Sequence, residues 1–175
     1  VLGATQLGYY QTAFNLGRSL ITEVGVIFSQ VLTPIMSRFQ TDRSRMERAF
    51  VRMLIPAGIS MLIPLGILNF PPAQEILFHF LQDKWRPILP LLPYLTIGAW
   101  ITGVTIVGNA VYLVRDEVKT LVALYIVALS SLLTLMYYMT TQFGILGAVQ
   151  AVLIVKVVMA PLFAWKTFSL ITHRK

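Results

Sequence analysis

Long apolar segments run along the chain, separated by short polar or proline-marked stretches. Each has the roughly 20 residues that an α-helix needs to cross about 30 Å of hydrocarbon. Lipid offers backbone groups no hydrogen-bond partner, and the chain lacks the short alternating segments of a barrel, so these segments should be helices. The pattern predicts five spans, at residues 7–37, 44–70, 87–114, 118–140 and 144–170.

Two shorter signals lie beside the second span. Ser44 and Glu47 have the spacing of a capping box, which marks a helix start. The segment at about residues 73–82 is amphipathic but too short to cross a bilayer. It is therefore predicted to be an interfacial helix, with Trp85 at headgroup level.

Composition supports a membrane protein. The 175 residues are 57% hydrophobic and 12% charged, and the mean hydropathy is +0.75, far outside the range of soluble domains. The predicted fold class is therefore all-α, a polytopic transmembrane helix bundle. With no cysteines there are no disulfides or thiolate sites. No nucleophile with a base, phosphate loop or metal cluster stands out, so neither an enzyme nor a cofactor is predicted.

The positive charges are very unevenly placed, and this predicts the topology. Cytoplasmic loops are enriched in Lys and Arg, and only Lys84 and Arg86 fall on the side opposite the basic group. The N-terminus is therefore expected outside and the C-terminus inside. The net charge of +7 is juxtamembrane, so it favours contact with anionic membrane lipids over nucleic acid. The basic group comprises Arg38, Arg43, Arg45, Arg48, Arg52, Arg115, Lys119, Lys166, Arg174 and Lys175.

The first predicted span carries polar residues that lipid would not tolerate. At about 100° per residue, they fall between roughly −60° and +80° of Asn15, on one face of the helix. The remaining arc is apolar and suits lipid or another apolar helix. The polar face must be covered by the rest of the protein or by water inside it. Its candidate site residues are Asn15, Arg18, Thr22, Glu23, Ser29 and Gln30.

Two interpretations of this face remain open. Ser, Thr, Asn and Gln side chains can simply bond across to neighbouring helices. Arg18 and Glu23, however, lie several residues from either end, and charges at such depth favour a hydrated transport cavity. Lys156, near the middle of the last span, is a further candidate. Its stem could instead reach an interface or a backbone carbonyl near Pro161.

These residues carry a family resemblance. The stretches "LGYYQTAFNL", "VLTPIMSRFQTDRSRMERAF" and "PPAQEILFHFLQDKWRPILPLLPYL" resemble the C-terminal part of bacterial polysaccharide-biosynthesis flippases. Those flippases belong to the multidrug, oligosaccharidyl-lipid and polysaccharide exporter superfamily. Gln82 stands where a Gly is common in the family. Matching residues are Gly8, Tyr9, Tyr10, Pro34, Ser37, Lys84 and Trp85.

The resemblance implies a function and a partner. The chain would be part of a two-lobe transporter of the bacterial plasma membrane, completed by a missing N-terminal lobe. It would translocate a lipid-linked oligosaccharide by alternating access, with hydroxyls, amides and Arg18 replacing the hydration of the anionic carrier. The start "VLGATQLG" lacks the flank of a signal peptide, and an odd span count starting outside also indicates a piece of a longer protein.

Two alternatives remain open. A multidrug-type cation antiporter of the same fold would depend on Glu23 more than on Arg18. A non-transporting membrane scaffold would use the polar face only to hold helices together.

Overall fold

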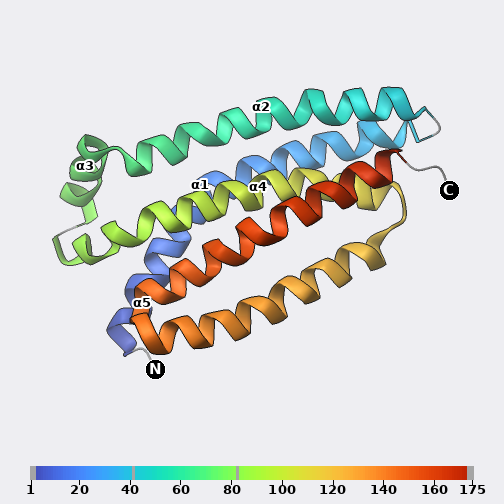
Figure 1. Cartoon of the computed structure of the whole chain (residues 1–175). Helices are drawn as coiled ribbons and strands as arrows, with labels where there is room; N and C mark the ends of the chain where they lie inside the picture. The colour runs from blue at the N-terminus through green and yellow to red at the C-terminus, as the bar shows by residue number, and fades with distance from the viewer. Residues whose placement is uncertain (1–2, 41, 82, 173–175) are drawn as a thin grey trace.

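The computed structural model describes residues 3–40, 42–81 and 83–172, and every element in these ranges is helical (Figure 1). Four segments, in α1, α2, η1 with α4, and α5, are long and apolar enough to cross a membrane. This confirms an all-α membrane helix bundle. The elements are α1 (Ala4–Ser37), α2 (Arg43–Asn69), α3 (Pro71–Leu81), the 3-10 helix η1 (Asp83–Leu91), α4 (Leu92–Val114) and α5 (Val118–Thr172).

The longest element, α5, folds back on itself. Its 55 residues would extend about 80 Å as one helix, more than twice the hydrocarbon thickness. At Gly144 the backbone leaves the helical region, with φ 61° and ψ −139°. The first arm (118–143) and the second arm (145–172) then run antiparallel (Figure 1). The ring centroids of Tyr125 on the first arm and Phe163 on the second lie 5.4 Å apart. The fourth and fifth predicted spans correspond to these two arms.

The backbone at Gly144 explains why a glycine stands at this bend. A φ of 61° with ψ of −139° is a combination that residues with a Cβ rarely adopt. We expect Gly144→Ala to destabilise the chain by about 1–3 kcal/mol. The midpoint of unfolding in mixed detergent and SDS micelles measures this. Gly8→Ala, at a helical position with open space around it, is the control and should not lower the midpoint.

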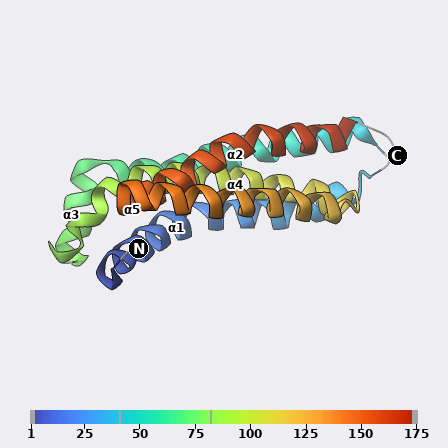
Figure 2. The same ribbon diagram turned by 60° about the horizontal axis from the view of Figure 1, so that its bottom comes forward.

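The long helices α1, α2 and α4 and the two arms of α5 run nearly along one axis, and their connections collect at two ends (Figures 1 and 2). The α1–α2 turn, the α4–α5 turn and the end of α5 share one end, where Gln40 Nε2 donates to the Val114 carbonyl at 3.1 Å. Arg115 donates back to the Gln40 carbonyl at 3.3 Å. Most of the basic group belongs to these segments. The alternation of charge thus matches the path of the chain, while the cytoplasmic side stays a prediction.

The start of α2 differs in detail from the capping box that its sequence predicts. The helix begins at Arg43, and the Asp42 carboxylate accepts the Arg45 backbone N–H at 3.1 Å. Ser44 donates to the same carboxylate at 2.9 Å. These hydrogen bonds, that of Arg45 first, lower the pKa of Asp42, so Asp42 caps the helix in its charged form.

The short helix predicted next to the second span is present, and its location at the membrane interface stays a prediction. It was expected at residues 73–82, and α3 spans Pro71–Leu81 because Pro71 fits the first turn of a helix. Gln82 lies outside the described residues. Trp85 follows in η1 and packs edge-on against Tyr9 of α1, with ring centroids 5.9 Å apart. The segment therefore closes the end of the bundle opposite the basic turns (Figure 1).

The face that α1 buries is not the one that its polarity indicates. Small residues bring its backbone onto α4, where a Cβ on Gly25 would lie 2.5 Å from the Gly103 carbonyl oxygen. Membrane helices usually pack through small residues. In lipid no hydrophobic effect favours their association, so close packing of the backbones must stabilise it. Of the predicted apolar arc, Leu20 and Ile27 stay exposed. The buried stripe is Ala13, Gly17, Ile21, Thr22, Gly25, Leu32 and Met36.

Candidate functional site

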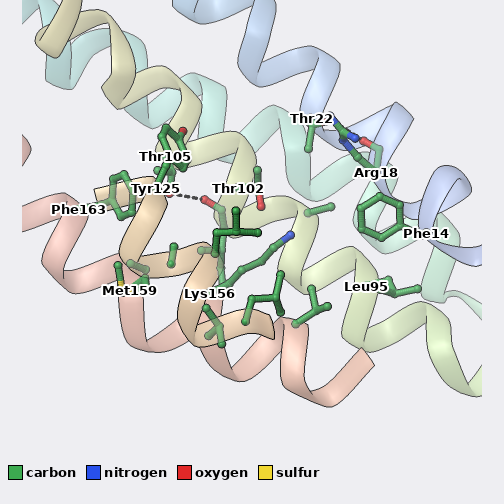
Figure 3. A pocket seen from close by; sticks show the side chains of 18 residues that line it. Phe14, Arg18, Thr22, Leu95, Thr102, Thr105, Tyr125, Lys156, Met159 and Phe163 are labelled. Atoms are coloured by element: carbon green, nitrogen blue, oxygen red, sulfur yellow. Dashed lines mark hydrogen bonds between the residues drawn. The ribbon is translucent and has the colours of Figure 1, made fainter. Parts of the chain in front are cut away.

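A cavity of about 330 Å³ lies between α1, α4 and both arms of α5 (Figure 3). We call it the inner cavity. Most of its wall is apolar, and its polar groups come from α1, α4 and both arms of α5, so sequence proximity could group only those that share a helix. Its polar side chains are Arg18, Thr22, Thr102, Thr105, Tyr125 and Lys156.

Two cations from different helices line the inner cavity. The Arg18 guanidinium carbon lies 5.9 Å from the centroid of the Phe14 ring. The half-buried Lys156 extends towards α4 and donates to the Gly98 carbonyl at 3.2 Å (Figure 3). None of the described lining side chains is acidic, and no ion pair of either cation occurs in the described part of the chain. The cavity therefore offers positive charge without a protein counter-ion.

The threonine hydroxyls of the inner cavity are already bound to their own helices. Thr22 donates to the Arg18 carbonyl at 2.8 Å. Thr102 and Thr105 likewise donate to the carbonyls of Gly98 and Ile101, four residues earlier. Each hydroxyl proton is thus engaged, and its oxygen keeps acceptor capacity. The Tyr125 hydroxyl also donates, to Asn109 Oδ1 at 3.4 Å, so the donors left for a ligand are the two cations.

A second polar surface runs along α1. Its lining residues all belong to α1, so it is an open strip of helix surface without an opposite wall, and we call it the α1 groove. Arg18 and Thr22 line both the α1 groove and the inner cavity, so the two spaces meet there. The residues of the α1 groove are Thr12, Asn15, Leu16, Arg18, Ser19, Thr22 and Glu23.

The seven predicted site residues fall into three places. Arg18, Thr22 and Lys156 line the inner cavity. Asn15 and Glu23 belong to the α1 groove instead.

Ser29 and Gln30 line neither space. The Ser29 carbonyl accepts the Thr33 hydroxyl at 2.8 Å, and Gln30 is exposed further along α1. A helical wheel gives the direction of a side chain around the helix axis but not its position along that axis. It therefore grouped these two residues with a site that lies several turns away.

Sequence reasoning missed the contributions of α4 and of the first arm. Thr102 and Thr105 lie within an apolar span, and Tyr125 seemed an ordinary residue of the next one. The Tyr125 hydroxyl also contacts Asn109, whose Nδ2 donates to it at 3.0 Å. The spacing of polar residues on α4 was only a weak sequence signal that this helix contributes to the site. Within the described ranges, no group of three or more His, Asp or Glu side chains could hold a metal ion.

Comparisons with known proteins agree with this architecture. An "Uncharacterized membrane protein in cps region" of Klebsiella pneumoniae is 25% identical over 161 residues, 91% of this chain. The chain spans about a third of that relative's length, 33%. No solved structure matches the chain. The profile of a family described as "Polysaccharide biosynthesis protein" matches residues 1–90, just over half of the sequence, so the chain belongs to this polysaccharide biosynthesis family.

Proposed function

We propose that the chain is the C-terminal part of a flippase for lipid-linked oligosaccharides or polysaccharide repeat units in the bacterial plasma membrane. Such a substrate joins a hydrocarbon chain to a sugar through an anionic phosphate group. The observation that carries the proposal is the pair Arg18 and Lys156, which line one cavity with no acidic side chain among its described residues. The family membership agrees with a polysaccharide-related substrate.

The electrostatics of the inner cavity favour an anion. A charge far from water is costly, and the usual compensation within a membrane span is a partner of opposite sign. Arg18 and Lys156 lack such a partner in the described chain, so a bound phosphate group would supply it. Arg18 can hold phosphate oxygens in a bidentate fork and Lys156 can act as a point charge. Translocation then requires binding and release, with no covalent step.

The α1 groove supports the presence of a second lobe. Asn15, Ser19 and Glu23 are exposed on it, and hydrocarbon would not solvate these groups. A facing lobe would turn the groove into a hydrated path, and alternating access would then be a rocking of the two lobes. The chain covers about a third of its relative, which leaves room for that lobe. We place the N-terminus outside and the basic turns in the cytoplasm.

The alternative of a multidrug-type cation antiporter has less support. Such a transporter would need an acid at its site, and Glu23, which lies several turns from either end of α1, lines the α1 groove but not the inner cavity. A non-transporting scaffold would be expected to bury its polar face between helices. It would pack that face of α1 against the second lobe and leave no hydrated path, which transport by the complete protein distinguishes.

The test is transport by the complete two-lobe protein reconstituted in vesicles. We expect it to move a labelled lipid-linked sugar at least tenfold faster than protein-free vesicles, and not to move a cationic dye. The 175-residue chain alone should not exceed the background, because one polar helix face cannot enclose a path. Movement of the dye without the sugar would support the antiporter, and movement of neither would leave the scaffold.

A further inference from the structure

The two cationic groups of the inner cavity lie towards one end of its length. Figure 3 shows Arg18, Phe14 and Thr22 towards one end and Tyr125, Met159 and Phe163 towards the other. Lys156 lies between them, with its nitrogen on the side of Arg18. The wall beyond Lys156 is mostly apolar, and its two hydroxyls, of Thr105 and Tyr125, already donate to the Ile101 carbonyl and to Asn109 Oδ1. The space therefore has the polarity of an amphiphile with an anionic head.

The first arm of α5 forms an exposed wall of the inner cavity. Leu129 lines the cavity and is still 56% exposed. The first arm packs with α4 and the second arm through Leu121 and Leu124, in a cluster that contains no described residue of α1. A hydrocarbon chain can therefore enter from the membrane beside Leu129.

The two spaces differ in size and in chemistry. At about 330 Å³, the inner cavity lies at the lower end of the range for small-molecule sites, about 300–1,000 Å³. A repeat unit of several sugars is larger and needs many hydrogen bonds, which apolar walls do not offer. The α1 groove sets no such limit on size, because it is open on the side away from α1, and it has the amide, hydroxyl and carboxylate groups that sugars bind.

We infer that the inner cavity binds the phosphate and the first part of the hydrocarbon chain of a lipid phosphate, while the sugar lies in the α1 groove. Arg18 and Thr22, shared by the two spaces, mark the junction between phosphate and sugar. Leu132 and Met159 contact the chain and so discriminate the lipid carrier. This inference rests on the proposed function, because it divides the same substrate between two places.

Photo-crosslinking to the complete protein in nanodiscs tests the inference. The probe is farnesyl phosphate with a diazirine in its hydrocarbon chain, and the crosslinked peptides are mapped by mass spectrometry. We expect labelling of the first arm around Leu129 and of the second arm around Met159. An excess of unlabelled farnesyl phosphate should reduce this labelling at least tenfold. Farnesol, inorganic phosphate and phosphatidylglycerol should compete at least tenfold less well.

A pair of neighbouring variants supplies the matched control. Leu132 lines the inner cavity, whereas Leu133 is 61% exposed on the outer side of the same arm. Leu132→Trp should fill the space and reduce the competed labelling at least tenfold. Leu133→Trp should leave it within twofold. Folding is checked for both by the midpoint of unfolding, and Ala128→Leu, also in the cavity wall, serves if Leu132→Trp is unstable.

Several outcomes would overturn the inference. Equal competition by farnesol would mean that the cations bind nothing, and equal competition by inorganic phosphate would mean that the apolar wall has no role. Equal competition by phosphatidylglycerol would make the cavity a site for ordinary phospholipid. Flipping without labelling of the cavity would refute the inference and keep the proposed function. Specific labelling of the cavity without flipping would refute the proposed function and keep the inference.

Discussion

Replacing Arg18 with Gln in the complete protein is expected to reduce flipping of a lipid-linked sugar about 10- to 100-fold. A hydrogen bond to a charged group contributes about 1.5–3 kcal/mol, and each 1.4 kcal/mol is a factor of about ten in rate. Arg18 lines both the inner cavity and the α1 groove, so its loss affects the point where phosphate and sugar would meet. Initial rates in vesicles, normalised to protein, measure the effect.

The abundance of this variant in the membrane should stay near normal. Removing one partner of a buried ion pair costs about 3–5 kcal/mol. Arg18, however, is exposed in the chain, and none of the described carboxylates pairs with it. Arg18→Lys should be partly active, because Lys keeps the charge and lacks the bidentate fork. Arg52→Gln, an exposed position outside both spaces, is the control. Normal flipping by Arg18→Gln would refute the headgroup role.

The path of the chain could be predicted from sequence because span length and charge alternation are local signals. The break at Gly144 followed from the polar stretch and glycine between two apolar runs. The break was recognisable because a single helix through both apolar runs would be longer than any bilayer is thick. The N-terminal residue of α2 was less certain, since Asp42 and Ser44 are both good caps. Such choices depend on the turn geometry that only the structure shows.

The site was predicted in part, and the missing part has a physical cause. Polarity alone assigned the open and buried faces of α1, but membrane helices pack through small residues such as Gly17 and Gly25. The spacing of small residues on α1 was therefore the stronger signal for its buried face. The meeting of Arg18 and Lys156 in one cavity is a long-range contact between α1 and α5, which no pattern within either helix contains.

Gly25→Ala is expected to destabilise the chain by about 1–3 kcal/mol, the typical cost of overpacking. The new Cβ would lie 2.5 Å from the Gly103 oxygen and 2.9 Å from its Cα. Both are backbone atoms, so the helices themselves must separate. Alanine is favoured over glycine within a helix by about 1 kcal/mol, so a loss of stability must come from the contact. The midpoint of unfolding in mixed SDS micelles is the measurement.

The matched substitution elsewhere should have the opposite sign. Gly66 lies on α2, where a Cβ would meet no neighbouring atom within 4 Å, so Gly66→Ala should gain helix propensity and be neutral or stabilising. A separation of α1 from α4 would also carry Arg18 away from Lys156, because Arg18 lies two turns before Gly25 on the same rigid helix. Gly25→Ala should therefore lose flipping along with stability. Equal stability of the Gly25→Ala and Gly66→Ala variants would show that the α1–α4 contact can relax, and that the position of α1 is fixed by other contacts.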